Sequence, residues 1–387
     1  MDVLAITNLF PDRDRPGFAP FNRQQLWHLA GECRLRIVSP VPWPLRLRRL
    51  VSGAPSGPPE EFEGKAEIHY PVLFYMPKVL RATYGWSYER SIAPLVGRLA
   101  AEARPDVIYA TWAYPDCYAA VSIGRRLGIP VVSRVHGSDV NQYLRFPERR
   151  RRIVEAMTGS AVVVTVSGAL GGSLEEAGVP PGKIELLYNG IDRTRFRPED
   201  RSGARSELGL PEAGRIVLYT GNLNPGKGID LLIEALPEAG IPDAVLHIIG
   251  SGPSEGTLRR MAARLEDGRV HFHGRVAHHM IGRWMNACDL FCLPSLDEGT
   301  PNVLLEALAC RTPVVATDTG GIPEIVSPES GILFPKGDVP ALAGALRAAL
   351  ERDWDRDRIV CPASSWEDNA RSLAGILQRA ASSTSRR

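Results

Sequence analysis

The chain has 387 residues, of which 44% are hydrophobic, 23% charged and 7% aromatic, and its formal net charge is +2. Such a composition is typical of a folded globular protein and excludes the collagen-like, coiled-coil and largely disordered classes. Because a single hydrophobic core stops growing at roughly 250–300 residues, the length predicts two domains. The longest apolar runs are strand-sized, so no segment is expected to cross a bilayer.

The first residues and the cysteines bear on the compartment. The sequence begins directly with a strand pattern and lacks the basic region that opens a secretory signal. Six cysteines are scattered without a CxxC pair, which indicates neither a disulfide framework nor a zinc finger. We therefore expect a cytoplasmic protein with reduced thiols.

Charge is distributed unevenly along the chain. Residues 1–197 carry a formal charge of +7 and the remainder carries −5. Two basic clusters lie in the first half, at 46–49 and 149–152. This asymmetry suits an anionic surface or substrate, and equally a solvated basic face.

Short apolar runs alternate with helix-length segments along the whole chain. In the first half, strands are predicted at 3–7, 35–39, 107–111, 131–135, 162–166 and 184–188, and helices at 21–30, 92–103 and 117–127. In the second half, strands are predicted at 216–220, 245–249, 270–272, 290–293 and 314–317, and a helix at 229–236. Most strands are continuously apolar, which is typical of parallel sheets covered on both faces. The repeated βα units therefore predict an α/β fold with doubly wound sheets.

The predicted domains are residues 1–195 and 196–364, each Rossmann-like. A polar stretch near 192–215, with two prolines and no strand pattern, marks the boundary. Residues 365–387 are predicted to form a helix capped by Ser365 and able to pack back on the first domain, with a frayed tail from Ala380. Two such sheets are expected to hold a ligand in the cleft between them, at the carboxyl ends of their strands.

The segment 293–324 carries the strongest chemical signal. After a strand, Thr300 is predicted to cap a helix whose first residue is Pro301. The start of this helix offers free N–H groups and a positive dipole end, which suit a phosphate or a sugar oxygen. Glu298 precedes the helix and Glu306 lies six positions into it, so the two carboxylates could bind hydroxyls on either side of a diphosphate. Alternatively, Glu298 only complements the helix dipole and Glu306 is a solvated helix residue.

A second signal follows the strand at 216–220. Lys227 lies in a glycine-containing loop just before the helix at 229–236, where an ammonium group can reach a phosphate. A Walker A loop is excluded, because Gly228 rather than Ser or Thr follows the lysine. The alternative is a solvated loop lysine.

Taken together, these segments resemble the family 4 retaining glycosyltransferases with the GT-B architecture, in which two Rossmann-like domains face each other across a cleft. The resemblance covers essentially the whole chain, and its specificity comes from the ordered set rather than from any one motif. The segments that carry it are HGSD at 136–139, VS at 166–167, LYNGID at 187–192 with Phe196 and Pro198, GNL at 221–223 with KG at 227–228, GSG at 250–252, VHFHG at 270–274, and DEGTPNVLLEALACRTPVVATDTGGIPE at 297–324.

The resemblance implies an enzyme that moves a hexosyl group from a nucleotide-diphosphate sugar to a glycan or lipid-linked acceptor. It implies retention of configuration by front-face displacement, a role in cell-surface polysaccharide or glycolipid synthesis, and neither a metal nor another cofactor. Nucleic acid is not an expected partner.

The same resemblance implies roles for individual residues. The implied catalytic residues are His136, Lys227 and Glu298. The implied donor-binding residues are Gly17, Asn222, Lys227, Arg275, Glu298, Gly299, Thr300, Pro301, Asn302 and Glu306. On the acceptor side the implied residues are His136 and Asp139, although Asp139 could simply orient its loop.

One departure from the family pattern concerns the diphosphate. The family usually has an arginine where this chain has Asn222, so one fixed cation is missing. Arg275 or Arg23 could replace it, or Asn222 could donate a neutral hydrogen bond. The loop containing Gly17 also has one glycine where the family has two.

Two clusters are not expected to bind metal. Asp12 and Asp14 resemble a DxD metal site, but they lie too early in the chain for the fold that uses one. Histidines occur at positions 271, 273, 278 and 279, without a cysteine or carboxylate that would complete a zinc site. We expect a structural role for them.

The acceptor is less well defined. Segments 40–50 and 79–90 mix aromatic, aliphatic and basic residues, which is typical of a membrane interface and also of an ordinary loop packed on its domain. The first reading predicts peripheral contact with the anionic inner face of a membrane. Two other functions fit the same architecture, a sugar-nucleotide 2-epimerase and a non-catalytic nucleotide-sugar-binding protein. An NAD-dependent dehydrogenase is disfavoured because neither half has GxGxxG after its first strand.

Overall fold

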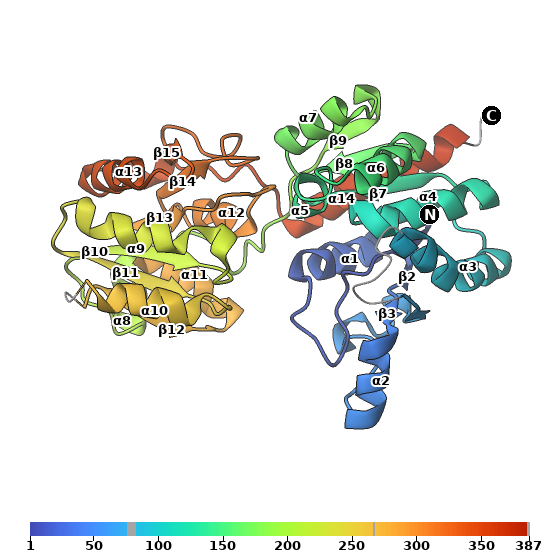
Figure 1. Cartoon of the computed structure of the whole chain (residues 1–387), viewed down its shortest axis with the longest axis horizontal. Coiled ribbons are helices and arrows are strands. Elements are labelled where there is room, and N and C mark those ends of the chain that lie inside the picture. The colour runs from blue at the N-terminus through green and yellow to red at the C-terminus, as the bar shows by residue number, and fades with distance from the viewer. Residues whose placement is uncertain (76–82, 266–267, 385–387) are drawn as a thin grey trace. The chain divides into compact units, whose positions relative to one another are not determined.

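The computed structural model describes residues 1–75, 83–265 and 268–384 (Figure 1). Its contacts divide the chain into two α/β units. Unit 1 consists of Met1–Gly190 together with the C-terminal segment from Trp366, and unit 2 consists of Ile191–Ser365. The division thus lies a few residues before the predicted boundary at 195/196. None of the helices in the described ranges combines the length and hydrophobicity that a bilayer span requires.

Unit 1 is built on a seven-stranded parallel sheet of order β4-β2-β1-β6-β7-β8-β9. The strands are β1 (Asp2–Ile6), β2 (Arg34–Val38), β4 (Ala66–His69), β6 (Val107–Thr111), β7 (Val131–Arg134), β8 (Val162–Thr165) and β9 (Ile184–Leu186). A separate parallel pair joins β3 (Val41–Pro42) to β5 (Val72–Leu73). The helices are α1 (Pro20–Glu32), α2 (Trp43–Ser52), α3 (Tyr84–Glu102), α4 (Tyr118–Leu127), α5 (Ser138–Asn141), α6 (Pro147–Gly159), α7 (Gly168–Ala177) and α14 (Trp366–Thr384).

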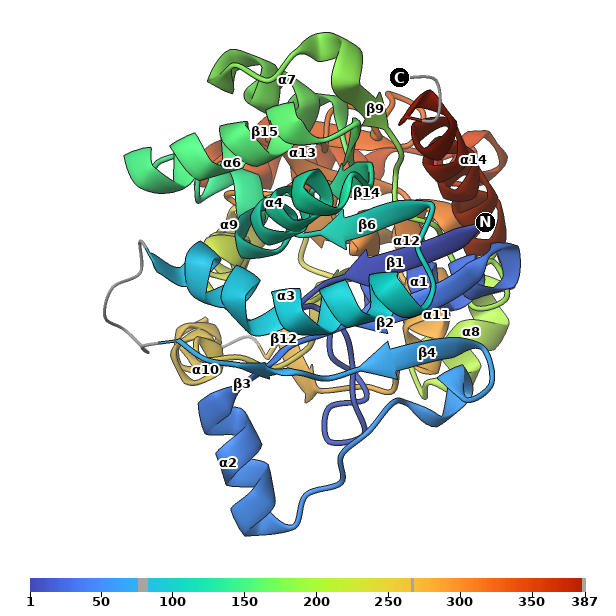
Figure 2. The same cartoon turned by 90° about the vertical axis from the view of Figure 1, so that its right-hand side faces the viewer.

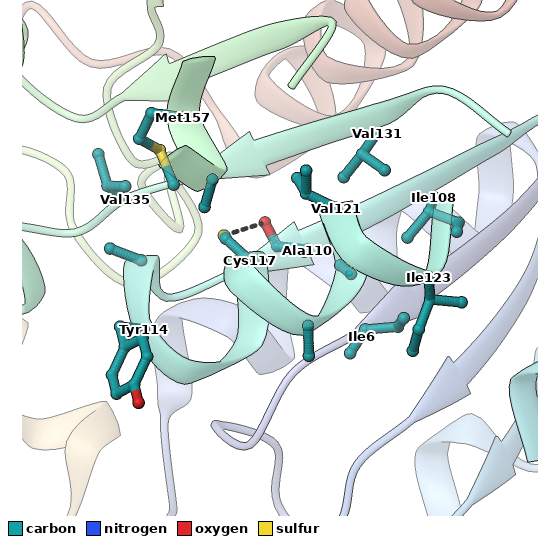
Figure 3. Packing of buried hydrophobic residues seen from close by; sticks show 14 of the residues in the cluster. Ile6, Ile108, Ala110, Tyr114, Cys117, Val121, Ile123, Val131, Val135 and Met157 are labelled. Atoms are coloured by element: carbon teal, nitrogen blue, oxygen red, sulfur yellow. Dashed lines mark hydrogen bonds between the residues drawn. The ribbon is translucent and has the colours of Figure 1, made fainter. Parts of the chain in front are cut away.

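The unit 1 sheet is buried on both faces, which explains its continuously apolar strands. Leu4 and Ile6 of β1 belong to a core shared with α3, α4, α6 and α7, part of which is drawn in Figure 3. Val3 and Ala5 belong to a second core on the opposite face, shared with α1 and α14. Because successive side chains of a strand point to opposite faces, apolar residues are favoured at nearly every position of such a strand.

The C-terminal helix belongs to unit 1. Leu373 and Leu377 of α14 are fully buried in the second core, beside Leu26 and Leu29 of α1. Ala380 is buried as well and α14 continues to Thr384, so the predicted frayed tail from Ala380 is wrong as far as Thr384. The tail looked polar because only one face of this last helical turn meets the core.

Unit 2 contains a six-stranded parallel sheet of order β12-β11-β10-β13-β14-β15. The strands are β10 (Arg215–Thr220), β11 (Ala244–Ile249), β12 (Val270–Gly274), β13 (Leu290–Leu293), β14 (Val314–Asp318) and β15 (Gly331–Pro335). The helices are α8 (Arg201–Glu207), α9 (Ile229–Glu238), α10 (Glu255–Ala263), α11 (His278–Ala287), α12 (Asn302–Ala309) and α13 (Val339–Glu351). The predicted class, two Rossmann-like doubly wound parallel sheets, is confirmed.

Several elements were not predicted, among them two strands and a helix for which the sequence gives a reason. Strands β4 and β15 are sheet edges, and their sequences AEIH and GILFP are too polar or too broken by Gly and Pro to be read as strands. Helix α8 lies inside the polar stretch that was predicted to mark the domain boundary. Of the predicted segment 79–90, residues 79–82 lie outside the described residues, and α3 begins at Tyr84.

Replacing Leu377 by Ala should lower the free energy of unfolding by about 2–5 kcal/mol, because it removes a fully buried side chain that joins α14 to the second core. Urea unfolding followed by circular dichroism measures the change. The exposed neighbour Gln378 provides the matched control, and Gln378→Ala should leave stability nearly unchanged. Equal, small effects of both substitutions would show that α14 does not contribute to the core.

Candidate functional site

The loops at the carboxyl edge of the unit 2 sheet meet where the strand order reverses. Strand β10 pairs with β11 on one side and with β13 on the other, so the chain leaves β10 and β13 in opposite directions. Such a switch point is the usual ligand position of an open α/β sheet. The loops 221–228 and 294–301 follow these two strands, and their backbones are joined by a hydrogen bond from Leu296 N to Gly226 O at 3.0 Å.

Four glycines let the loop backbones approach more closely than any side chain would permit. We call Gly228, Gly250, Gly252 and Gly320 the glycine cradle. A Cβ atom on Gly250 would lie 1.8 Å from the carbonyl oxygen of Gly221, and one on Gly228 would lie 2.1 Å from that of Pro294. A Cβ on Gly320 would lie 2.0 Å from the carbonyl oxygen of Glu298. Gly228, Gly250 and Gly320 also have positive φ angles, so two independent constraints require glycine there.

Lys227 and Glu298 come from different loops and form an ion pair beside the cradle. Lys227 Nζ lies 2.5 Å from Glu298 Oε1, and the side chains are 30% and 12% exposed. The sequence predicted each residue separately, and the structure brings them together. The pair holds an ammonium group at the switch point while keeping it accessible, which is what an anionic ligand requires.

The helix after β13 begins later than predicted. α12 starts at Asn302, and Pro301 is its N-cap, with φ −73° and ψ 118° and without a side-chain cap. The prediction of Thr300 as N-cap and Pro301 as first helical residue is therefore wrong. Pro301 keeps an extended ψ, and its carbonyl accepts the first bonds of the helix from Leu304 N and Leu305 N. The backbone of Gly299 is held by Gly321 N, which donates to Gly299 O at 2.8 Å.

Glu306 lies on α12 in a poorly solvated position. Its side chain is 14% exposed, and burial together with the nearby carboxylate of Asp192 raises its pKa to about 7. His278 Nε2, at the start of α11, lies 3.8 Å from Glu306 Oε1. On its other side, His278 Nδ1 is 3.2 Å from a guanidinium nitrogen of Arg195. Sequence reasoning missed this environment, because Asp192 and His278 are far from Glu306 along the chain.

Of the two arginines proposed to compensate for Asn222, the structure gives one to each unit. Arg275 follows β12, and its Nε donates to Ser251 Oγ at 2.7 Å. Ser251 O in turn accepts from Leu223 N, so Arg275 is linked to the loop of the exposed Asn222. Arg23 is in unit 1, where it pairs with Glu61 at 2.5 Å.

In unit 1, the loop after β7 carries His136 and Asp139. The fully buried Asp139 accepts hydrogen bonds from His136 N and Gly137 N through one carboxylate oxygen and from Ala113 N through the other. Burial raises the pKa of this carboxyl, and the three backbone donors partly offset the effect. Asp139 thus joins the loops after β6 and β7, which is the loop-orienting alternative of the sequence analysis.

The His136 ring lies among aromatic side chains. Its centroid is 4.6 Å from that of Phe21 and 6.5 Å from that of Trp112. Burial and the neighbouring Arg134 hold the pKa of His136 well below its usual range, so the imidazole is neutral. Both ring nitrogens are buried, and neither has a hydrogen-bond partner among the described residues.

The remaining predicted residues have other surroundings. Gly17 lies in the loop before α1, and a Cβ there would meet nothing within 4 Å, so packing does not require glycine. Asp12 and Asp14 both form ion pairs with Arg49. In the described ranges, no group of three or more His, Cys, Asp or Glu side chains is arranged to hold a metal ion.

The predicted histidine cluster divides into two. His273 Nε2 is hydrogen-bonded to Nδ1 of the buried His247 at 2.8 Å, and His271 packs against His247. Burial and these neighbours lower the pKa of His247 to about 4, so the interaction is between largely neutral rings. His278 stands apart, beside Glu306.

Comparison with known proteins identifies the family. The model described as Glycosyltransferase Family 4 matches residues 49–195, and that described as Glycosyl transferases group 1 matches residues 214–352. A protein of Bacillus subtilis (strain 168) named as the teichuronic acid biosynthesis glycosyltransferase TuaC is 32% identical over 368 residues, covering 92% of this chain and 90% of its own. A GDP-mannose-dependent monoacylated α-(1-6)-phosphatidylinositol monomannoside mannosyltransferase of Corynebacterium glutamicum is 32% identical over 277 residues, covering 64% of this chain and 70% of its own.

Solved structures agree on the fold. HepE of Anabaena in complex with UDP superposes with a TM-score of 0.70 at 22% identity, covering 100% of both chains. The sucrose-phosphate synthase of Thermosynechococcus elongatus has a TM-score of 0.71 at 21% identity, covering 100% of this chain and 98% of its own. The architecture is therefore GT-B, and on the motifs, the two family models and the nearly full-length relative, this chain belongs to the family 4 glycosyltransferases.

Proposed function

We propose that this glycosyltransferase moves a hexosyl group from a nucleotide-diphosphate sugar to a glycan or lipid-linked acceptor in cell-surface polysaccharide or glycolipid synthesis. The observation that carries the proposal is the Lys227–Glu298 pair beside the glycine cradle, with the largely buried Glu306 on helix α12. The names of the relatives support it, since they include teichuronic acid biosynthesis and a GDP-mannose-dependent enzyme that acts on a phosphatidylinositol mannoside. HepE has been crystallised with UDP and with UDP-glucose.

The proposed donor site assigns one task to each group. The diphosphate lies against the backbone N–H groups at the start of α12, and Lys227 supplies the charge that stabilises the departing phosphate. Before the donor binds, Glu298 holds this ammonium in place. When a phosphate of the donor binds the Lys227 ammonium, the Glu298 carboxylate is released from that ion pair. It can then accept hydrogen bonds from the hydroxyls of the donor sugar. Asn222 and Arg275 complete the phosphate contacts, and Glu306 receives the ribose hydroxyls.

In unit 1, we assign His136 to the sugar that reacts. A neutral imidazole with both nitrogens unpaired can donate one hydrogen bond and accept another, so it can orient a hydroxyl without adding charge. Asp139 positions this loop through three backbone donors.

We propose retention by front-face displacement, in which the departing phosphate takes the proton of the acceptor hydroxyl. The proposal follows from the side chains assigned to the donor site. Both carboxylates there are committed to hydroxyl groups, Glu298 to the sugar and Glu306 to the ribose, so neither serves as nucleophile. Lys227 supplies the positive charge, so we propose catalysis without a metal ion. We propose that the reaction takes place in the cytoplasm, at the inner face of the membrane, and the six free cysteines support a reducing compartment.

A panel of UDP-, GDP- and ADP-sugars tests the donor by thermal shift, and incubation with an acceptor tests transfer. Binding of one nucleotide class should raise the melting temperature by several degrees. The relatives are named as glycosyltransferases, which disfavours the two alternative functions, a 2-epimerase and a non-catalytic binding protein. An epimerase would convert the donor without acceptor, and a binding protein would leave it intact.

Replacing Lys227 by Ala should lower the turnover of sugar transfer by about 10²–10³, because the departing diphosphate loses its cation. Glu298→Gln should weaken donor binding and lower turnover as well, since a carboxylate accepts hydrogen bonds from hydroxyls better than an amide does. Steady-state kinetics with the donor identified by thermal shift measures both effects.

Lys336→Ala and Glu234→Gln are the matched controls, because both residues are exposed in the same unit. Their kinetics should equal those of the wild type. If Lys227→Ala retains full turnover with an unchanged melting temperature, the proposed phosphate contact is wrong.

Donor affinity should rise with pH between about 5.5 and 8. Glu306 has a raised pKa of about 7 in the free protein, and the ribose hydroxyls favour its ionised form. Donor binding therefore has to release a proton below pH 7, so the dissociation constant should fall by roughly 3- to 10-fold across this range. Calorimetry with an intact nucleotide sugar measures this, because its diphosphate has no titrating proton in this window.

Glu306→Gln should bind more weakly and show a flat pH profile. His278→Ala removes the neighbouring imidazole and should leave the slope in place. A slope that disappears with His278→Ala and persists with Glu306→Gln would assign the titration to the histidine instead.

A further inference from the structure

Helix α2 of unit 1 presents its apolar side chains to solvent rather than to the core. Trp43, Leu47, Leu50 and Val51 are 38%, 53%, 73% and 83% exposed. The described residues contain eleven exposed large hydrophobic side chains, and four of them lie on this single ten-residue helix. Both views show α2 projecting from the rest of unit 1 (Figures 1 and 2). An amphipathic helix normally buries its apolar face, so this orientation calls for a partner.

Two arginines border the exposed apolar face. At 100° per residue, the four apolar side chains fall within an arc of about 100°, with Arg46 on one side and Arg48 on the other. Neither arginine forms an ion pair within the part of the chain that the structure describes, and α2 contains no acidic residue. In the segment that follows α2, Glu61 pairs with Arg23 and Glu63 pairs with Arg13.

A buried ion-pair cluster fixes the rotation of the helix. Arg49, on the inner side, donates through Nη2 to both carboxylate oxygens of Asp12 at 2.8 Å and through Nε to Asp14 at 3.0 Å. Arg49 and Asp12 are 6% and 2% exposed. Because these contacts hold the inner face, the apolar face has to point outward. They also give the Asp12-Arg13-Asp14 motif a role other than metal binding.

We propose that α2 docks on an anionic lipid bilayer, with its apolar arc among the acyl chains and Arg46 and Arg48 on lipid phosphates. The inference deepens the proposed function and rests on it, since a lipid-linked acceptor is presented at a membrane. The two arginines favour a bilayer over a protein as the partner of α2. A purely apolar groove on a protein would leave both arginines unpaired. In an anionic bilayer, the lipid phosphates can pair with the arginines while the acyl chains accept the apolar arc. Asp12, Asp14 and Arg49 form the anchor of this docking helix.

Co-sedimentation with vesicles of phosphatidylcholine, with and without phosphatidylglycerol, tests the docking. The full chain should bind the vesicles containing phosphatidylglycerol at low salt, and binding should decline as salt increases. Arg46→Gln and Arg48→Gln should each weaken partitioning by about 5-fold, which corresponds to roughly 1 kcal/mol for each charge. Leu47→Gln combined with Leu50→Gln and Val51→Gln should weaken it at least 10-fold.

The controls separate this surface from general charge and hydrophobicity. Arg98→Gln with Arg125→Gln removes two exposed arginines of the same unit, and Val360→Gln removes an exposed apolar side chain of unit 2. Both should bind like the wild type. No binding to anionic vesicles, or binding that the α2 variants do not change, overturns the proposal.

Asp14→Asn tests the anchor. If charge alone governed binding, removing an acid beside α2 would strengthen it. If the anchor orients the helix, vesicle binding by Asp14→Asn should instead fall several-fold. An increase or no change in vesicle binding overturns the proposed role of the anchor. Donor binding by thermal shift is measured on every variant: unchanged donor binding with lost vesicle binding supports docking by α2, whereas lost donor binding with intact vesicle binding contradicts the proposed function instead.

Discussion

The close approach of loop backbones at the carboxyl edge of the unit 2 sheet is the constraint on which the candidate donor site depends. Gly250 and Gly228 each lie where a Cβ would overlap a carbonyl oxygen of the adjoining loop. Without this approach, the loops after β10 and β13 could not bring Lys227 to Glu298. The glycines therefore act through packing, and the charged pair is the consequence.

Electrostatic environment distinguishes the two halves of the proposed chemistry. In unit 2 the groups assigned to the donor are charged or titrate near neutrality: the partly exposed ammonium of Lys227 and the carboxyl of Glu306, whose pKa burial raises to about 7. In unit 1, burial lowers the pKa of His136 and raises that of Asp139, so the ring is neutral and the carboxyl is held by backbone donors. A site that must stabilise a leaving diphosphate needs a cation held in position, whereas one that orients a hydroxyl needs directed hydrogen bonds.

Unit 1 also shows how the same amphipathic logic serves two purposes. α14 turns Leu373 and Leu377 into the core beside α1 and contributes to folding. α2 turns its apolar side chains away from the core, because the buried cluster around Arg49 occupies its inner face. A surface helix normally buries its apolar face and exposes its polar face. In α2 the polar anchor is buried and the apolar arc is exposed, and this reversal indicates an interaction surface.

Local patterns alone determined the class of fold and most strands, because strands such as 107–111 and 290–293 are buried on both faces and therefore continuously apolar. Glycine and charge motifs likewise identified the loops around Lys227 and Glu298. Edge strands β4 and β15 and helix α8 were not predicted, since one solvated side weakens the apolar signal. Only the tertiary structure decided that Lys227 meets Glu298, that Asp192 and burial raise the pKa of Glu306, and that Arg49 holds Asp12. Those outcomes depend on distances between residues far apart in the chain, and on the burial of charge, neither of which a local pattern encodes.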